Sequence, residues 1–492
     1  MSLHHWVAGL HLSNLFSVQP VSNETTPEQQ PEPQQPEWKN IEEPPDGPNY
    51  IATLPPELLA HTFSLSLPSR RFPTQVPFEV TLSHVSEFWR DVALNTPNLW
   101  TKINIYSPRS SGLITEYLRR SGQRLLLDID IDTYTFEKST ATMLKKQISL
   151  AEALSKELAP QVSRIRNLSF FCYFKITPTV VLSGFPQSSA LCLQRFVVKY
   201  DSPTHPASSN VPQAGRVPIF ENGSPHLSFL ETDLPDVLPS TSSLRNLTTL
   251  CLHSLDESSQ HTYASFVEVL TAPHSLLYLS VQGTIKLNSW PMHQGGPTFE
   301  LSKLKALRLL DDGLMAAKML LSMCAPDMES LWLDFRTREF TSFFDSPQMT
   351  MAVGLSKFRA LKYLTIPNDN FRALESFAKA FPTITHLHLP HPVFWQADQL
   401  QKALKTHWAF VHTIVISMTR ESRLESLYSA LNEILPHRRR TGHPIQTLLI
   451  DKDLFGTMAR NAPKIIKQVN AEAVSPQNYH EIWWNKVDRL EQ

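Results

Sequence analysis

The sequence has few cysteines and few glycines for its length. Its 492 residues include four cysteines and 14 glycines. The cysteines lie far apart and form no C-x-x-C pair, which argues against a disulfide scaffold or a zinc site and is typical of a reducing compartment. No glycine belongs to a G-x-G-x-x-G pattern, a phosphate-binding loop or a G-x-S-x-G nucleophile elbow. These absences disfavour nucleotide-binding enzymes and serine hydrolases.

A net charge and a long apolar run are also missing. The 45 basic and 46 acidic residues give a formal charge of -1, so no global field attracts nucleic acid or an anionic membrane. No apolar run is long enough to span a bilayer, and the N-terminus lacks the pattern of a signal peptide. We therefore expect a cytoplasmic and/or nuclear protein with no nucleic-acid or membrane partner. The single basic cluster, at residues 437–440, is interpreted as a solvated loop, with a nuclear import signal or a phosphate contact as alternatives.

Residues 53–100 show two amphipathic helical patterns joined by a proline-rich connection. Pro55 and Pro56 suit the first turn of a helix, where backbone N–H groups lack partners, and Glu57 suits the positive end of its dipole. The first apolar stripe consists of Leu54, Leu58, Leu59, Thr62 and Phe63. We expect this helix to end before Pro68.

The second helix is predicted over residues 82–92. Its stripe consists of Leu82, Val85, Phe88, Trp89 and Val92, and Asn95 and Pro97 are expected to close it. Two short helices cannot bury both stripes in a core of their own. An apolar face is therefore left for the rest of the chain or for another protein.

The order of motifs in this region resembles the F-box family. The sequence has LPPELL at 54–59, VSEFWR at 85–90 and LW at 99–100, where that family has L-P-x-E-[LI]-[LW], V-C-[KR]-x-W-[RK] and L-W. It departs from the family at Ser86, which replaces a cysteine, and in a connection over 68–81 that is longer than usual and is similar to that of F-box-like proteins of mushroom-forming fungi.

The resemblance implies a box that docks on a Skp-type adaptor of a cullin-RING ubiquitin ligase, while the rest of the chain selects the client protein. The residues that would form or support the adaptor-binding surface are Leu54, Pro55, Leu58, Leu59, Phe63, Val85 and Trp89.

The composition changes along the chain and divides it into four segments. Residues 1–49 are rich in Pro, Gln and Glu and are expected to be disordered. The F-box is placed at 50–101, a repeat domain at 102–470 and a C-terminal tail at 471–492.

An L-x-x-L-x-L outline recurs eight times in the repeat domain. Its equivalent positions are Leu250, Leu279, Leu307, Leu331, Leu364, Leu387, Ile414 and Leu448, at intervals of 23 to 34 residues. The pattern resembles degenerate leucine-rich repeats, whose periods are about 20–29 residues. Each short strand needs stacked neighbours to cover its leucines, and the stretches at 263–270 and 371–380 read as helices between strands. We expect the runs at 102–106, 125–131, 167–171 and 193–198 to extend the stack. The predicted fold class is therefore α/β, a short helical F-box followed by a curved leucine-rich-repeat-like solenoid.

Two polar clusters raise the question of metal binding. Asp128, Asp130 and Asp132 alternate with apolar residues, which favours a half-buried strand over the metal site of a transferase. His386, His388 and His391 have no cysteine or acidic neighbour, so we interpret them as exposed strand residues. No metal or cofactor is predicted.

Four ring-bearing residues are predicted to share one position of the repeat and to align on one face of the sheet. They are Tyr278, Trp332, Tyr363 and His386. Aligned rings suit client-binding anchors or simple packing, and both interpretations stay open. The sequence thus predicts a non-catalytic substrate-recognition subunit of an SCF-type ligase. The alternative is a leucine-rich-repeat scaffold without ligase association.

Overall fold

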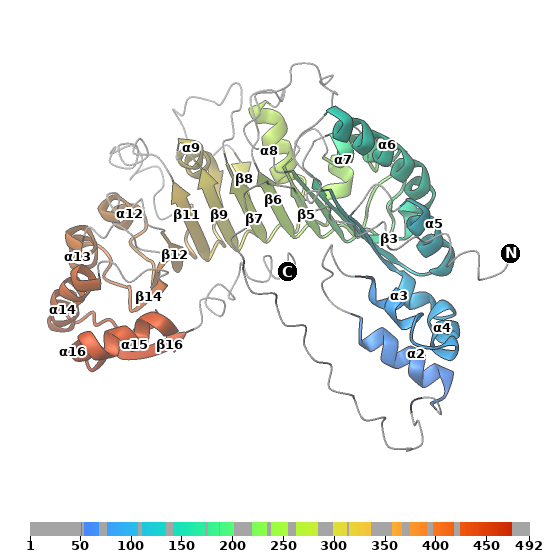
Figure 1. The fold of residues 1–492 in the computed structure, drawn as a ribbon. Helices are drawn as coiled ribbons and strands as arrows, with labels where there is room; N and C mark the ends of the chain where they lie inside the picture. Colours follow the sequence, from blue (N-terminus) through green and yellow to red (C-terminus); the bar gives the residue numbers. More distant parts are fainter. Residues whose placement is uncertain are drawn as a thin grey trace, which may run out of the picture. The chain divides into compact units, whose positions relative to one another are not determined.

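The chain forms two compact units, residues 1–125 and 126–492 (Figure 1). The structure is a computed structural model, and it describes residues 51, 54–67, 76–106, 111–133, 141–172, 176–185, 187–200, 219–233, 238–253, 262–283, 299–311, 314–335, 357–366, 374–390, 397–417 and 424–474. The segment at 1–49, which the sequence predicts to be disordered, lies outside these residues. Each unit is considered by itself.

The first unit is mainly helical. Its described elements are α2 (Pro56–Leu65), α3 (Phe78–Leu82), α4 (Glu87–Leu94), the 3-10 helix η2 (Pro97–Trp100), β1 (Lys102–Ile105) and α5 (Ser111–Arg120). The prolines open α2 as predicted, with Pro56 as its first residue, and α2 ends before Pro68. The predicted end of the second helix is also confirmed, because α4 ends at Leu94.

The prediction of one helix over 82–92 is wrong, because the pattern is divided between α3 and α4. The backbone turns at residues 83–86, and the Ser86 hydroxyl accepts a hydrogen bond of 3.1 Å from the backbone N–H of Trp89. This N-cap starts a new helix at Glu87, since a serine side chain satisfies a backbone donor that the first helical turn leaves open. The predicted connection over 68–81 is also shorter than expected, because α3 already begins at Phe78.

The second unit is mixed α/β and is built on a large parallel sheet. Its strands follow the order β2-β3-β4-β5-β6-β7-β9-β11-β12-β13-β14-β15-β16. They span Leu127–Asp132, Ile165–Cys172, Arg195–Tyr200, Phe229–Thr232, Thr249–His253, Tyr278–Gln282, Ala306–Asp311, Ser330–Phe335, Tyr363–Thr365, His386–Pro390, Thr413–Ser417, Thr447–Asp451 and Asn470–Val474. A separate parallel pair joins β8 (Phe299–Glu300) to β10 (Met323–Cys324).

The eight predicted repeat positions lie side by side in this sheet. Leu250 pairs with Leu279, Leu279 with Leu307, and the register continues through Leu331, Leu364, Leu387, Ile414 and Leu448. Each of these side chains is at most 1% exposed. The strand positions read from the sequence are therefore confirmed, and the leucines form a continuous buried row.

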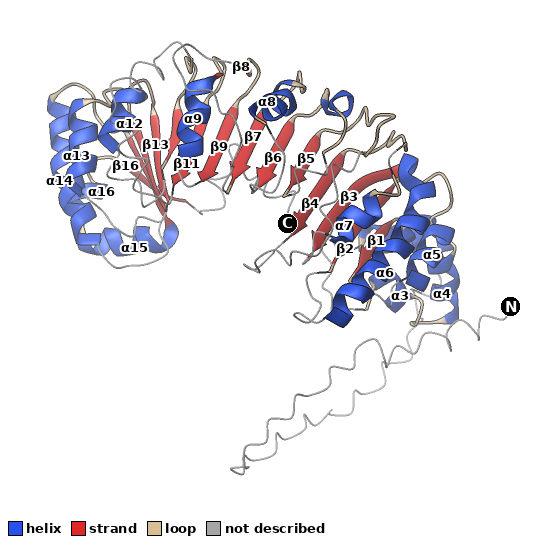
Figure 2. Ribbon diagram, turned by 90° about the horizontal axis from the view of Figure 1, so that it is seen from above, coloured by secondary structure: helices blue, strands red, loops and turns tan. Residues whose placement is uncertain are grey.

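Helices occupy the connections between strands. The described ones are α6 (Ala141–Leu158), α7 (Ile176–Leu182), α8 (Tyr263–Thr271), α9 (Leu314–Ser322), α12 (Leu374–Ala380), α13 (Ala397–Thr406), α14 (Leu424–Arg440), α15 (Lys452–Asn461) and α16 (Pro463–Ile466), with 3-10 turns η4 (Ala159–Arg164) and η6 (Thr241–Leu244). Figure 2 shows α8, α9, α12, α13 and α14 along one side of the sheet. Side chains alternate between the two sides of a strand, so the residues next to each buried leucine point away from these helices. We call this side the front face; it carries Tyr278, Trp332, Tyr363 and His386.

Two expectations about the C-terminal part need correction. The basic cluster at 437–440 forms the last turn of α14 rather than a solvated loop, and Arg438 is only 3% exposed. The predicted tail at 471–492 begins inside β16, which pairs in parallel with β15. Tertiary burial thus removes Arg438 from any surface signal.

Candidate protein-binding sites

The predicted adaptor-binding residues of the first unit separate into a buried and an exposed set. Leu59 and Phe63 are each 2% exposed and form part of the core of the unit. Leu58 and Val85 are 55% and 57% exposed, and Pro55 is exposed as well. Leu54 and Trp89 are half-buried. The apolar stripe of α2 is thus divided, with Leu59 and Phe63 supporting a surface to which Leu58 contributes.

Another exposed apolar side chain, Phe88, is absent from the adaptor-binding residues selected from the sequence. It is 37% exposed at the start of α4. The Phe63 and Trp89 rings, with centroids 4.9 Å apart, hold α2 and α4 together. The i, i+3 pattern of the sequence contains Phe88 but does not tell which members of the stripe face the core.

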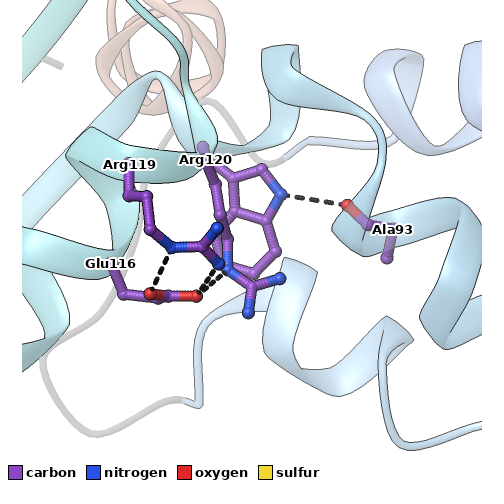
Figure 3. A network of polar contacts seen from close by, with 5 residues as sticks. Ala93, Glu116, Arg119 and Arg120 are labelled. Atoms are coloured by element: carbon purple, nitrogen blue, oxygen red, sulfur yellow. Dashed lines mark hydrogen bonds and ion pairs between the residues drawn. The ribbon is translucent and has the colours of Figure 1, made fainter. Parts of the chain in front are cut away.

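Trp100 anchors the C-terminal end of this helical region. Its indole N–H donates to the carbonyl oxygen of Ala93 at 2.9 Å, and its ring meets Tyr117 edge-on at 5.1 Å. The Arg120 guanidinium lies 4.6 Å from the ring centroid. Figure 3 shows Arg120 beside Glu116, whose carboxylate binds Arg119 and Arg120, each at 2.5 Å. The hydrogen bond from Arg119 lowers the pKa of Glu116.

A buried carboxylate lies in the same unit. Glu79 of α3 is 0% exposed and accepts a hydrogen bond from the Tyr117 hydroxyl. Because Tyr117 also contacts Trp100, one side chain of α5 connects α3 with η2. The packing of residues 54–100 therefore depends on a helix that follows them in the sequence.

Residues that pair across neighbouring strands form one level of the front face. Three of the four predicted ring-bearing residues share such a level. Tyr278 pairs with Ala306, Ala306 with Ser330, Ser330 with Tyr363 and Tyr363 with His386. Trp332 is an exception and corrects the prediction, because it pairs with Arg308 and Thr365. It occupies the next front-face level, two residues further along its strand. One strand face presents several levels, so a shared face does not imply a shared level.

Rings contact one another within each of these two levels. Tyr363 and His386 lie 4.4 Å apart and His386 and His412 lie 5.0 Å apart, measured between ring centroids. Trp332 meets His388 edge-on at 6.3 Å, and Arg308 lies 4.6 Å from the Trp332 ring centroid. Burial, followed by the positive fields of His412 and Lys362, lowers the pKa of His386 to about 4.

A charged group on strands β4, β5 and β6 was missed by sequence reasoning. The Glu231 carboxylate is 1% exposed, and its Oε1 atom lies 2.8 Å from Lys199 Nζ and 2.9 Å from His253 Nε2. His253 Nδ1 is 3.8 Å from Asp233. The three contributing segments are far apart in sequence, and only the strand register brings them together. Burial raises the pKa of Glu231, but hydrogen bonds and charges of His253 and Lys199 outweigh it and hold the pKa at about 2.

We expect the Glu231 group to make stability depend on pH under acidic conditions. Because the folded pKa of about 2 lies below the ordinary 4.5, the contribution is fully present above 4.5 and is lost as the pH falls toward 2. A shift of this size corresponds to about 3 kcal/mol over the whole window. Urea unfolding between pH of about 5 and about 3 should show a shallower loss of stability with falling pH for Glu231→Gln than for the wild type.

Glu152→Gln, which changes an exposed carboxylate of α6, serves as the control and should follow the wild-type pH dependence. Equal slopes for Glu231→Gln and the wild type would contradict the assigned role of Glu231.

The two polar clusters considered as metal ligands behave differently. Asp128 lies on β2, which alternates buried and half-buried residues as predicted, and binds Arg166 at 2.6 Å. His386 and His388 lie on one side of β13, but the expectation that they are exposed is wrong: His386 is half-buried, and His388 is 6% exposed because its ring lies between the Thr365 and Ser417 hydroxyls. His391 lies outside the described residues. Among the residues described, no three His, Cys, Asp or Glu side chains are grouped to hold a metal ion. No helix in the described ranges is long and apolar enough to cross a membrane.

Comparison with known proteins assigns no family. No family model matches the chain, and no curated protein matches it. A crystal structure of a protein from Bacteroides fragilis is similar over 72% of this chain and 79% of that chain, with 10% sequence identity and a TM-score of 0.30. A similarity this low supports no conclusion about family or function.

Proposed function

We propose that this protein is a non-catalytic substrate-recognition subunit of an SCF-type cullin-RING ubiquitin ligase. In this proposal residues 50–101 form an F-box that binds a Skp-type adaptor. Residues 102–470 form a curved leucine-rich-repeat-like solenoid whose front face selects a client protein, with Tyr278, Trp332, Tyr363 and His386 as client-binding residues. No cofactor takes part.

The observation that carries the proposal is the exposure of apolar side chains on a folded helical unit. Leu58, Val85 and Phe88 are 55%, 57% and 37% exposed, while Leu59 and Phe63 of the same region are buried. Transferring one such side chain from water into a partner is favourable by about 1.5–3 kcal/mol. Short helices that keep apolar side chains outside their own core are suited to dock in a groove of another protein.

The repeat architecture is supported by the leucine row of the second unit. Equivalent residues of successive repeats pair directly, as Leu279 does with Leu307, and they are fully buried. A repeat that covers its leucines only by stacking on its neighbours is the building principle of solenoid proteins. Such a stack presents one side chain per strand at each level of the front face, which suits an extended client.

The proposed mechanism requires no reacting group on this chain. A receptor that holds a client and the ligase core on one scaffold raises the effective concentration of a client lysine near the charged ubiquitin carrier. The rate enhancement then comes from tethering.

The test is direct binding of the purified chain to a Skp-type adaptor. Leu58→Asp should weaken binding at least about 100-fold, because it places a carboxylate in an apolar interface. The matched control is Leu65→Asp, which makes the same change at the last residue of α2, where the side chain is 74% exposed. Circular dichroism would verify that both variants fold.

Leu65→Asp should bind like the wild type, since it lies outside the predicted surface. No binding by the folded wild-type chain would contradict the receptor proposal and would favour the repeat scaffold without ligase association. Equal loss in both variants would contradict the assignment of Leu58.

A further inference from the structure

The N-terminal ends of strands β12, β13 and β14 form a small, ordered surface on the second unit. The Lys362 carbonyl accepts hydrogen bonds from the backbone N–H groups of Thr385 and His386, at 2.9 and 3.0 Å. The Thr385 carbonyl in turn accepts from His412 at 3.1 Å. Because these backbone bonds join the N-terminal ends of neighbouring strands, they hold Lys362, Thr385 and His412 next to one another in a fixed order.

Two imidazole rings on this surface are oriented by threonine hydroxyls. His386 Nδ1 lies 2.8 Å from Thr385 Oγ1, and His412 Nδ1 lies 3.0 Å from Thr413 Oγ1. The His386 ring also contacts Tyr363 at a tilt of 36° and meets His412 edge-on at 74°. Within the described part of the chain, neither Nε2 atom has a hydrogen-bond partner, and exposed Lys362 has no ion-pair partner. Three nitrogen atoms of adjacent strands are thus available to a ligand.

The charges around His386 all have one sign. On the adjoining strands, its titratable neighbours are Lys362, which precedes β12, Tyr363 in β12, and His412, which precedes β14. On its own strand, His388 follows two residues later. His388 is engaged with Ser417 Oγ at 3.0 Å. The nearest carboxylate in the backbone register is Glu329, whose Oε1 atom lies 3.4 Å from Lys305. No carboxylate contributes to the pKa of His386, which burial, His412 and Lys362 all lower.

We propose that Lys362, His386 and His412 form a docking point for an acidic side chain of a client protein. The inference rests on the proposed function, since it specifies the client class that the front face selects. Lys362 would donate to the carboxylate from Nζ, and each imidazole would donate from Nε2 once the ring is protonated. We choose a protein carboxylate over nucleic acid because the Tyr363 ring lies beside the three nitrogen atoms and the near-zero net charge of the chain gives no field that attracts nucleic acid.

Binding at this point would be coupled to proton uptake. A nearby anion favours the charged form of a histidine, so an acidic ligand should raise the pKa of His386 from its value of about 4. If the bound value is about 6, affinity should increase about tenfold as the pH falls from about 7 to about 5, while glutamate side chains remain mostly ionised. A ligand held by apolar contacts alone would show no such dependence.

The experiment uses the full chain labelled with 13C at histidine Cε1 and a hexaglutamate peptide as the probe. NMR titrations at several pH values would follow the His386 resonance, assigned with His386→Gln. We expect the peptide to move this resonance toward the protonated position and to bind more tightly at lower pH. Hexalysine should cause no change.

Variants separate the docking point from a general attraction of acidic peptides. Lys362→Gln should weaken hexaglutamate binding about three- to tenfold, as expected for one partly exposed charge contact. Lys452→Gln, which removes an exposed lysine of α15, should leave binding unchanged. Equal effects of the two variants, or a His386 resonance insensitive to the peptide, would overturn the inference.

Adaptor binding measured on the same wild-type sample distinguishes the two proposals. Peptide binding without adaptor binding would contradict the ligase-receptor function and leave the acidic docking point in place. Adaptor binding without peptide binding would contradict the docking point alone.

Discussion

Replacing Arg438 by methionine should lower the free energy of unfolding of the second unit by about 4 kcal/mol. Arg438 lies in the last turn of α14, is 3% exposed and donates to four backbone carbonyls. Nη1 binds the carbonyls of Leu404 and Trp408 at 3.2 and 2.6 Å, and Nη2 binds those of Ala409 and Val411 at 2.9 and 2.6 Å. Methionine fills part of the volume but removes all four of these hydrogen bonds, and the Trp408 carbonyl keeps the longer bond of 3.4 Å from the Val411 N–H.

The size of this effect follows from the position of the carbonyls. Leu404 belongs to the last turn of α13, where carbonyl groups have no partner within the helix, and residues 407–412 lead into β14. Arg438 therefore closes the C-terminal end of one helix and the turn that follows it. Burial lowers the pKa of Arg438, but a guanidinium stays charged throughout the physiological range.

Urea unfolding followed by circular dichroism would measure the loss. Arg440→Met is the matched control, because Arg440 is exposed in the same turn, and it should change stability by no more than about 0.5 kcal/mol. Arg438→Lys should lie between the wild type and Arg438→Met, since an ammonium cannot reproduce the fork of the guanidinium. A midpoint of Arg438→Met equal to that of Arg440→Met would contradict the role of Arg438.

Replacing Trp100 by alanine should destabilise the first unit by about 4 kcal/mol. Trp100 is 1% exposed and combines a hydrogen bond to Ala93, an edge contact with Tyr117 and the Arg120 guanidinium over its ring. Alanine would leave a cavity the size of an indole and would remove the 2.9 Å bond to the Ala93 carbonyl, which keeps a longer bond of 3.4 Å from the Thr96 N–H. The helices that carry Leu58 and Phe88 should then lose their order, and adaptor binding should be lost with them.

Hydrogen exchange with mass spectrometry would locate the effect. In Trp100→Ala, peptides from α2 and α4 should exchange faster, while peptides from β9 and β11 keep their wild-type protection, because β9 and β11 belong to the other compact unit. Arg119→Gln is the control, since its side chain is 66% exposed and surface ion pairs contribute little. Equally fast exchange of the β9 and β11 peptides would contradict the expected localised effect.

The repeat pattern of the sequence was enough to place eight strands of the second unit, from β6 to β15, but it did not predict β5 or β16. The leucines from Leu250 to Leu448 recur within a short outline, and each must be buried against its equivalent in the next repeat. The spacing of the leucines and their need for burial both predict that equivalent leucines pair in neighbouring strands, and the strand pairing confirms this. Residues close by in sequence also set the two helix ends that were predicted correctly. Pro56 begins α2, and Asn95 with Pro97 ends α4.

The single helix predicted over 82–92 in the first unit was wrong because two local signals compete there. The apolar pattern from Leu82 to Val92 favours one helix, but the Ser86 side chain caps a second helix and the backbone turns before it. The pattern also could not separate exposed Leu58 from buried Leu59, because that difference depends on what packs against α2.

The roles of the charged and ring-bearing residues depend on tertiary contacts. Arg438 stands in a basic run that reads as surface, yet it is buried because carbonyls of α13 and the following turn surround its guanidinium. Glu231 meets Lys199 and His253 only because parallel pairing places three distant strands side by side. Trp332 lies one level away from Tyr363 because strand register, rather than residue type, assigns each side chain its level. Contacts between residues far apart in sequence have no local pattern, so they become visible only when the chain is folded.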